Sequence, residues 1–303
     1  MNEDNIMLAE LVVKGGKIVH EMYGSDISAE TTLISWSMAK SITQALVGIA
    51  VLDGLLDVDL PTGLAAWSHD ERSAITLRHL LEMRSGLSWI EDYVDGENSD
   101  VIDMLFGKGK DDTAAYAISQ PLIAHPGTSW VYSSGTTNIV SRILGNALGD
   151  VNGSHHQMSK FMQDRLLDPL GMRAEPKFDT AGTFIGSSYV YATARDFAKF
   201  GELYLRDGEV NGMRILPEGW VDMARNQHSL DTDSGLGYGS HWWTLPGERN
   251  SLVAAGYDGQ YIMVIPDRDL VVVRLGKTVA AQRNAVVAHL RSLIETYPLT
   301  GGR

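Results

Sequence analysis

The sequence contains no cysteine among its 303 residues. This absence excludes disulfide bridges, thiolate metal sites and cysteine nucleophiles. Basic residues are also scarce: 25 Lys and Arg stand against 38 Asp and Glu, so the net charge is −13. Because no run of Lys or Arg could neutralise phosphates, we expect neither nucleic acid nor an anionic membrane as a partner.

Long hydrophobic runs are missing as well. The longest apolar stretch, residues 42–52, is interrupted by Thr43, Gln44 and Gly48. It is far shorter than the ~20 residues that a membrane-spanning helix needs. The first ten residues carry acids where a secretion signal would carry Lys or Arg. We therefore expect a cytoplasmic protein, with a periplasmic or secreted location as the alternative if the N-terminus is processed.

Both ends of the chain predict β-structure. Residues 9–24 hold two short β-branched runs joined by Gly15-Gly16, the pattern of a hairpin with a two-residue turn. Residues 259–276 again hold two apolar runs, split at residues 266–269, and residues 279–297 follow as an amphipathic helix. Strands at both ends predict one antiparallel sheet built from the two chain ends.

Between these ends the pattern is mainly helical. Thr193 and Asp196 are spaced like a capping box at the start of the last predicted helix. The predicted helices span residues 37–55, 76–83, 112–119, 138–148, 159–166 and 194–205. We therefore predict an α+β fold in one domain, whose sheet is flanked by helices. Its α/β part would span about residues 1–60 and 180–303, and an inserted helical lobe about residues 61–179.

A lysine stands at the start of the most apolar part of the chain. Lys40 is the last charged residue until Asp53, so a helix over this stretch would be buried nearly all round. Burial disfavours the charged form of lysine, by up to ~3–5 pKa units in the extreme. A neutral lysine is a base.

Ser37 lies three residues before that lysine. Positions i and i+3 share one helix face, and a helix start favours developing negative charge. The alternative is that Ser37 only caps the helix while Lys40 reaches solvent, and Ser-x-x-Lys alone is weak support for catalysis. The charge-free helix behind Lys40 favours a nucleophile and its base.

Tyr132 is a second candidate for proton transfer. It follows the Pro126-Gly127 turn and precedes a predicted helix, on a connection that presents side chains. The alternative is a core tyrosine whose hydroxyl is satisfied by hydrogen bonds.

Three segments together resemble the serine β-lactamase and penicillin-recognising superfamily. They are SMAK at residues 37–40, YSS at residues 132–134 and AAGYDGQYIMVIP at residues 254–266. Residues 75–89, 191–208 and 235–243 are similar to segments of its class C-like esterase branch. Residues 88–107 resemble the substrate-covering loop of the 6-aminohexanoate-oligomer hydrolases.

The resemblance implies a role for each matching residue. Ser37 would be the acyl-forming nucleophile, Lys40 its base, and Tyr132 the proton shuttle to the leaving group. The backbone N–H groups of Ser37 and of Tyr257, which follows Gly256, would form the oxyanion hole. The substrate contacts implied in addition are Tyr93 on the covering loop and Ser134, which stands where many relatives have Asn. No metal and no cofactor is implied.

The third segment departs from the superfamily pattern. Relatives that bind β-lactams have Lys or His, then Thr or Ser, then Gly, whereas this chain has Ala254-Ala255-Gly256. Two alanines offer neither a cation nor a hydroxyl to a substrate carboxylate. Gly276-Lys277-Thr278 is expected beyond the final strand and would not replace them. We therefore expect weak β-lactamase activity at most and a preference for uncharged acyl groups.

The leading hypothesis is a serine hydrolase, of the carboxylesterase or amidase kind, that cleaves a small ester or amide through an acyl-enzyme. A D-amino-acid-specific peptidase or an acyltransferase of the same superfamily would share the first half-reaction. A non-catalytic sensor of the penicillin-binding type is the alternative from another class. The sequence predicts no oligomeric state.

Overall fold

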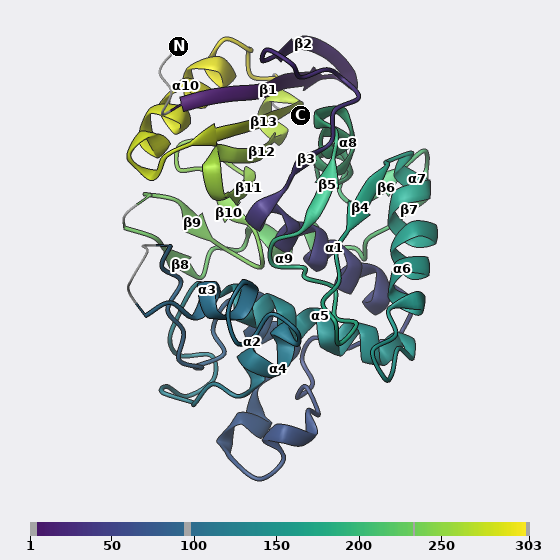
Figure 1. The fold of residues 1–303 in the computed structure, drawn as a ribbon. Helices are drawn as coiled ribbons and strands as arrows, with labels where there is room; N and C mark the ends of the chain where they lie inside the picture. The colour runs from purple at the N-terminus through teal and green to yellow at the C-terminus, as the bar shows by residue number, and fades with distance from the viewer. Residues whose placement is uncertain (1–4, 94–97, 233, 301–303) are drawn as a thin grey trace. The chain divides into compact units, whose positions relative to one another are not determined.

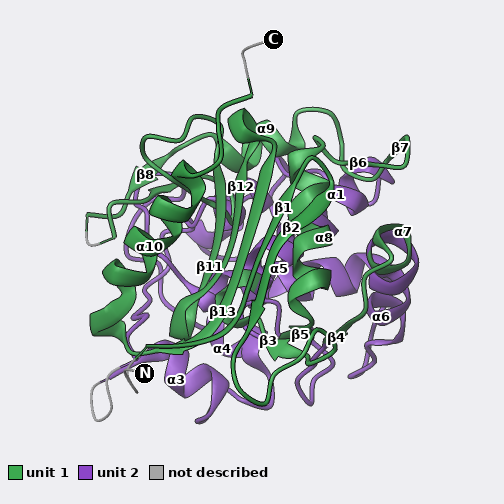
Figure 2. Ribbon diagram, turned by 90° about the horizontal axis from the view of Figure 1, so that it is seen from above, with its two compact units in different colours: residues 1–38, 167–175, 190–303 green, residues 39–166, 176–189 purple. Residues whose placement is uncertain are grey.

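The computed structural model describes residues 5–93, 98–232 and 234–300. Contacts within the chain divide it into two compact units, shown in separate colours in Figure 2. Unit 1 comprises Met1–Met38, Leu167–Glu175 and Val190–Arg303, and unit 2 comprises Ala39–Leu166 and Pro176–Tyr189. The grouping of both units into one domain stays a prediction.

Unit 1 is built on an eight-stranded sheet (Figure 1). The strand order is β2-β1-β13-β12-β11-β10-β9-β8, and neighbouring strands run antiparallel. The strands are β1 (Asn5–Lys14), β2 (Lys17–Tyr23), β8 (Ser229–Leu230), β9 (Gly237–Tyr238), β10 (Trp243–Thr244), β11 (Leu252–Gly256), β12 (Gln260–Ile265) and β13 (Leu270–Thr278). The sheet thus joins the two chain ends, as the sequence predicts.

The turn between β1 and β2 follows from its two glycines. Gly15 and Gly16 both have positive φ, 57° and 74°, the conformation that a two-residue hairpin turn requires. β1 then pairs along its length with β13, from Asn5 opposite Thr278 to Lys14 opposite Leu270. The expectation that residues 276–278 lie beyond the last strand is wrong, because the long β1 partner extends β13 through Thr278.

Helices cover both faces of this sheet (Figure 2). α8 (Ala194–Leu205) packs against β1, β12 and β13, and Gly201 allows the close approach, since a Cβ there would lie 2.6 Å from Val271 Cγ1. α10 (Arg283–Glu295) packs its Leu290 into a cluster that contains Val272. Successive residues of a strand point to opposite faces, so β13 serves both helices.

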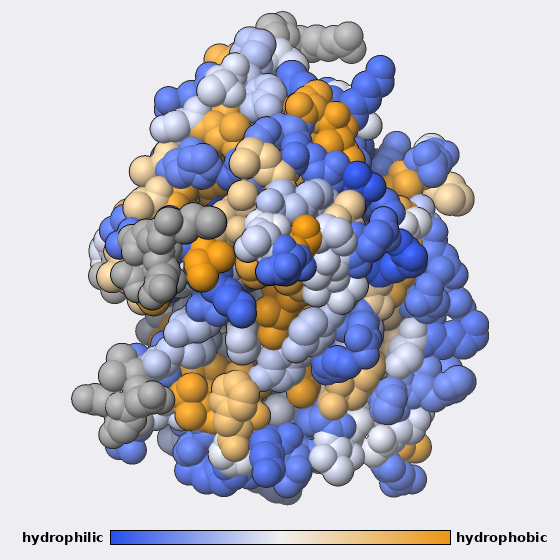
Figure 3. Space-filling view, turned by 45° about the horizontal axis from the view of Figure 1, so that its top comes forward, coloured by the Kyte–Doolittle hydropathy of each residue, from blue (hydrophilic) through white to orange (hydrophobic). Residues whose placement is uncertain are grey.

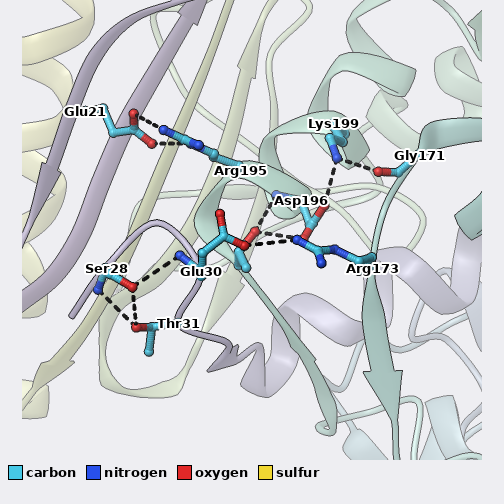
Figure 4. A network of polar contacts seen from close by, with 10 residues as sticks. Glu21, Ser28, Glu30, Thr31, Gly171, Arg173, Arg195, Asp196 and Lys199 are labelled. Carbon is cyan, nitrogen blue, oxygen red and sulfur yellow. Dashed lines mark hydrogen bonds and ion pairs between the residues drawn. The ribbon is translucent and has the colours of Figure 1, made fainter.

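Ion pairs surround the start of α8 (Figure 4). The guanidinium of Arg195 donates to both oxygens of Glu21 on β2, at 2.7 and 2.8 Å. Lys199 Nζ lies 2.9 Å from Asp196 and also donates to the carbonyl of Gly171. Arg173 pairs with Glu30 at 3.0 Å. The Arg173–Glu30 pair is exposed and contributes little to stability, whereas Asp196 is buried and its charge is compensated by Lys199.

Smaller elements complete unit 1. A separate three-stranded sheet has the order β3-β5-β4, and β6 pairs with β7 as a hairpin. These elements are β3 (Leu33–Ile34), β4 (Ala174–Pro176), β5 (Val190–Ala192), β6 (Glu209–Val210), β7 (Met213–Arg214), α7 (Asp168–Leu170) and α9 (Trp220–Arg225). Most are too short to show a period in the sequence.

Unit 2 is helical, in agreement with the predicted fold class, whereas the bounds predicted for the helical lobe, about residues 61–179, stay a prediction. Its helices are α1 (Ala39–Leu52), α2 (Leu77–Leu81), α3 (Asp100–Leu105), α4 (Thr113–Ile118), α5 (Ser134–Leu148) and α6 (His156–Met162), which continues into a π-helical turn, Gln163–Leu167. α5 packs against α1, α2, α3, α4 and α6. Residues 39–50 of α1 are all buried, which confirms the prediction of a helix buried nearly all round.

The ends of α5 follow from local chemistry. The side chain of Ser133 accepts a hydrogen bond from the backbone N–H of Thr136 at 3.0 Å, as an N-cap does. Gly149 ends the helix with φ 92°, a left-handed conformation that glycine adopts without strain. Tyr132 and Ser134 therefore flank a well-defined helix start.

Hydrophilic and hydrophobic residues are interspersed on the surface that Figure 3 shows. Single exposed apolar residues of this kind are normal for a globular protein. Among the residues that the structure describes, no helix combines the length and the apolar character needed to cross a bilayer.

Candidate active site

Ser37 lies in the 3₁₀ turn Trp36–Met38, which connects β3 to α1. Ser35 fixes this turn to β5: its N–H donates to the carbonyl of Val190 at 2.8 Å, and its hydroxyl accepts from the N–H of Val190 at 3.1 Å. The carbonyl of Ser35 then accepts from the N–H of Met38 at 3.2 Å. Ser37 itself is half-buried, so the residue is anchored and still partly accessible.

The residue before Ser37 is held in an unusual conformation. Trp36 has φ 44°, in the left-handed region that bulky residues rarely adopt. Such a conformation costs ~1–3 kcal/mol and persists only where surrounding contacts impose it. The Trp36 ring packs edge-on against the ring of Tyr257, with centroids 5.9 Å apart. Backbone strain of this kind is typical of functional sites.

Gly256 ends β11 directly beside this turn. A Cβ on Gly256 would overlap the carbonyl oxygen of Ser35 and would lie 3.2 Å from the amide nitrogen of Ser37. Only glycine allows the two backbones to come so close. Unit 1 therefore brings together Ser37, Gly256 and Tyr257, three of the residues that the sequence analysis selected.

The side chain of Gln260 supports the turn that contains Tyr257. Its amide nitrogen donates to the carbonyl of Tyr257 at 3.0 Å and to the carbonyl of Gly276 at 2.7 Å. Its amide oxygen accepts from the N–H of Gly276 at 3.0 Å. The 3₁₀ turn Tyr257–Gly259 is thus tied to β13, which limits its movement.

Lys40 is buried in unit 2, with 2% of its surface exposed. Its Nζ donates to the hydroxyl of Ser134 at 2.9 Å and to the carbonyl of Ser187 at 3.0 Å. Burial lowers the pKa of Lys40 to about 8, and the negative charge of Glu91 opposes this shift. The alternative in which Lys40 reaches solvent is therefore wrong. A substantial fraction of this amine is neutral near pH 8.

One tyrosine of unit 2 lies close to this lysine, and a second contacts Glu91. The Nζ atom of Lys40 is 4.9 Å from the centroid of the Tyr132 ring, and Tyr132 is half-buried on the segment before α5. The hydroxyl of Tyr93 donates to Glu91 at 2.9 Å. Burial raises the pKa of Tyr93, and the charge of Glu91 adds to that effect, so its phenol stays protonated. Residues 94–97 of the predicted covering loop lie outside the described residues.

Glu91 is a charged neighbour of Lys40 that the sequence analysis missed. One of its oxygens accepts from the N–H of Ser134 at 2.8 Å, and the other accepts from the hydroxyl of Ser134 at 2.5 Å. Trp89 Nε1 donates to the same carboxylate at 2.5 Å. No motif signals Glu91. It lies 43 residues before Ser134 in the chain, and only the fold brings the two together.

The candidate residues therefore form two groups, one in each unit. Ser37, Gly256 and Tyr257 belong to unit 1, whereas Lys40, Tyr93, Tyr132 and Ser134 belong to unit 2. The chain passes from one group to the other between Met38 and Ala39, where the 3₁₀ turn ends and α1 begins. Within the described ranges, no cluster of three or more His, Asp or Glu could hold a metal ion.

Comparison with known proteins identifies the class. A match to the beta-lactamase family spans residues 6–294, nearly the whole chain. The chain therefore belongs to the beta-lactamase family and is a hydrolase of that family.

Particular relatives agree with this assignment. The 6-aminohexanoate-dimer hydrolase of Paenarthrobacter ureafaciens is 26% identical over 296 residues, covering 90% of this chain and 73% of that protein. A candidate 6-aminohexanoate-dimer hydrolase from Bacillus anthracis has a similar structure, with a TM-score of 0.83 at 21% identity, over 98% of this chain and 81% of the other. A penicillin-binding protein from Bacillus halodurans has a TM-score of 0.72 at 19% identity, over 95% and 97%. These two solved structures have the same fold as this chain.

Proposed function

We propose that this protein is a serine hydrolase that cleaves small carboxylic esters or amides through an acyl-enzyme at Ser37. The observation that carries the proposal is the buried amine of Lys40, three residues after Ser37, with its pKa lowered to about 8. This amine is costly to bury in its charged form, and the nearby charge of Glu91 offsets that cost only in part. It is well suited to accept a proton near neutral pH.

Acylation would begin with proton transfer. The O–H bond of Ser37 breaks, its proton moves to the lone pair of Lys40 Nζ, and Ser37 Oγ bonds to the substrate carbonyl carbon. The carbonyl π electrons move to oxygen. Backbone N–H groups of Ser37 and Tyr257 would stabilise that oxyanion, a contribution of ~3–4 kcal/mol per donor.

Tyr132 would complete the half-reaction. As the bond between the carbonyl carbon and the leaving group breaks, the departing oxygen or nitrogen takes the proton of the Tyr132 hydroxyl. Lys40, now protonated, returns a proton to the phenolate. Water then attacks the Ser37 ester by the same steps in reverse order and releases the carboxylic acid.

The third segment favours uncharged acyl groups. Ala254 and Ala255 lie on β11 directly before Gly256, and neither can bind a substrate carboxylate. The name of the Paenarthrobacter relative adds a different candidate, an amide of two 6-aminohexanoate units, whose acyl half carries a charged ammonium group. We propose short linear esters and amides as the substrate class.

Labelling with a fluorophosphonate followed by peptide mass spectrometry tests the nucleophile. The label is expected on Ser37, and Ser37→Ala should lose both labelling and at least ~10³-fold in kcat for p-nitrophenyl butyrate. Ser68→Ala, at an exposed serine of unit 2, is the matched control and should behave as the wild type. Full activity in Ser37→Ala would overturn the assignment.

Burst kinetics separates this proposal from its alternatives. A burst followed by steady turnover of p-nitrophenyl butyrate supports a hydrolase. A burst without turnover supports a sensor that traps its ligand, and no burst supports a protein that only binds it. Product analysis with a competing amine distinguishes hydrolysis from acyl transfer, and a D-amino-acid amide tests the peptidase.

A further inference from the structure

The carboxylate of Glu91 is surrounded by hydrogen-bond donors in unit 2. Trp89 Nε1 and the N–H of Ser134 donate to Oε2, at 2.5 and 2.8 Å. The hydroxyls of Tyr93 and Ser134 donate to Oε1, at 2.9 and 2.5 Å. An ionised carboxylate has about four lone-pair sites, and these four donors fill them. Glu91 is therefore held in one orientation.

Packing around Gly135 fixes the approach of this carboxylate to α5. A Cβ on Gly135 would lie 2.6 Å from Trp89 Cη2 and 2.9 Å from Ala117 Cβ. The absence of a side chain there lets the Trp89 ring lie against the first turn of the helix, and Trp89 in turn donates to Glu91. The position of Glu91 is thus set by packing as well as by hydrogen bonds.

The hydrogen bonds also determine which way the Ser134 hydroxyl points. A serine hydroxyl has one proton, and this one is donated to Glu91. Ser134 Oγ can then only accept from Lys40, and the carbonyl of Ser187 can likewise only accept. Lys40 therefore makes both of these contacts through its N–H bonds.

A neutral amine has two N–H bonds and one lone pair. In the neutral form, Ser134 and Ser187 accept the two N–H bonds of Lys40. Because the bonds around the amine nitrogen are tetrahedral, these two hydrogen bonds fix the direction in which its lone pair points. If Ser134 instead donated its proton to Lys40, that bond would consume the lone pair. The lysine could then no longer accept a proton.

We propose that Glu91 is a positioning residue, which makes Ser134 an acceptor and thereby holds the Lys40 lone pair ready for the proton of the nucleophile. This inference rests on the proposed function. Through Ser134, Glu91 sets the orientation of the Lys40 amine. Its negative charge also acts directly on the pKa of that amine. Tyr132, whose ring lies near Lys40, and Tyr93, which contacts Glu91, are further titratable groups in this part of unit 2.

Glu91→Gln tests the proposal with two separate readouts. An amide nitrogen facing Ser134 Oγ lets Ser134 donate to Lys40, so the maximal rate of fluorophosphonate labelling should fall about tenfold or more. Loss of the negative charge lowers the pKa of Lys40 further, so the acidic limb of the pH–rate profile should move to lower pH. A merely structural role would move only the thermal midpoint.

A double-mutant cycle tests whether Glu91 affects the labelling rate through Ser134. In a Ser134→Ala background, Glu91→Gln should no longer reduce the maximal rate, although it should still move the acidic limb. Additive losses in the double variant would overturn the proposal. If Glu91→Gln does not fold, Ser134→Ala alone carries the test: the maximal rate should fall while the Glu91 charge is retained, and an unchanged rate would contradict the proposal.

Asp100→Asn, at the first residue of α3, is the matched control. Asp100 accepts from the N–H of Ile90 and from the hydroxyl of Tyr116, both at 2.8 Å, so its loss disturbs this segment without touching Lys40. Its thermal midpoint should fall while the acidic limb stays in place. Turnover in Ser37→Ala would refute the proposed function, whereas an inactive Ser37→Ala with an unaltered Glu91→Gln profile would refute only the role of Glu91.

Discussion

Gly256 and Ser35 approach so closely that a Cβ on Gly256 would overlap the Ser35 carbonyl oxygen. Both lie in unit 1, where β11 meets the 3₁₀ turn that carries Ser37. The candidate nucleophile and the Tyr257 turn are thus joined through their backbones.

Gly256→Ala is expected to displace this contact. The added methyl group should destabilise the fold by ~1–3 kcal/mol, as overpacking does. Movement of the Ser37 or Tyr257 amide should also lower kcat for p-nitrophenyl butyrate by about tenfold or more. Thermal unfolding and steady-state kinetics measure both effects. Gly54→Ala is the control, because a Cβ at Gly54 would have no atom within 4 Å. Its φ of 73° means that this variant reports backbone strain without a steric clash. Equal kinetics in Gly256→Ala and wild type would contradict this prediction.

The pH dependence of activity should follow the amine of Lys40. Below its pKa of about 8 the amine is protonated and cannot act as a base, so kcat/KM should fall as the pH decreases through that value. A pH–rate profile with a neutral ester measures the acidic limb. A profile that stays flat down to the range in which carboxylates titrate would exclude Lys40 as the base.

Stability should change with pH in the opposite sense to that expected for a lysine whose pKa is raised by an ion pair. Lys40 binds its proton less tightly in the folded state, with a pKa of about 8 against the usual 10.5. Between these values the unfolded chain binds more protons, so the free energy of unfolding rises with pH, by about 3 kcal/mol in total. Denaturant titrations at pH 7 and 10.5 should show this gain in wild type and lose it in Lys40→Met. The same increment in both proteins would contradict the lowered pKa.

Tyr132→Phe should separate substrates by their leaving groups. An alkyl amine leaves only after protonation, so amide hydrolysis should fall by ~10²–10⁴-fold. p-Nitrophenolate leaves without a proton, and the loss of activity with its esters should be much smaller. Parallel kinetics with a p-nitrophenyl ester and an alkyl amide of the same acid measure the ratio. Equal losses on both substrates would contradict a role in leaving-group protonation.

Hydrolysis of β-lactams should be weak. Ala254 and Ala255 supply no cation or hydroxyl for the carboxylate that these antibiotics carry. We expect kcat/KM for nitrocefin to be at least about a hundredfold below that for p-nitrophenyl butyrate, the effect of a missing charge-assisted contact. Comparable values would show that the carboxylate is bound by another part of the site.

Much of the fold can be predicted from the sequence because its main elements have strong local signals. Gly15-Gly16 marks the first hairpin, and the charge-free run after Lys40 marks the buried helix. Strands of two residues, such as β9 and β10, are too short for any period to appear. Their place in the sheet is set by their neighbours.

In the candidate site, too, some residues can be predicted from the sequence and others cannot. Ser37, Lys40 and Tyr132 lie in local patterns that chemistry and family resemblance can identify. Glu91 has no such pattern, because its importance comes from a contact with Ser134 that only the tertiary structure creates. The depression of the Lys40 pKa could be expected from the sequence, whereas the direction of its hydrogen bonds could not.

The pairing of β1 with β13 has a consequence for biosynthesis. β1 leaves the ribosome long before β13 but lies inside the finished sheet, where Lys14 pairs with Leu270. Until translation reaches that partner, the nascent hairpin presents an open, unpaired backbone edge while the intervening helices are still being made. Contacts so distant along the polypeptide slow folding and prolong exposure to aggregation. Chaperone demand in a cell that produces this protein should therefore last until β13 has been made.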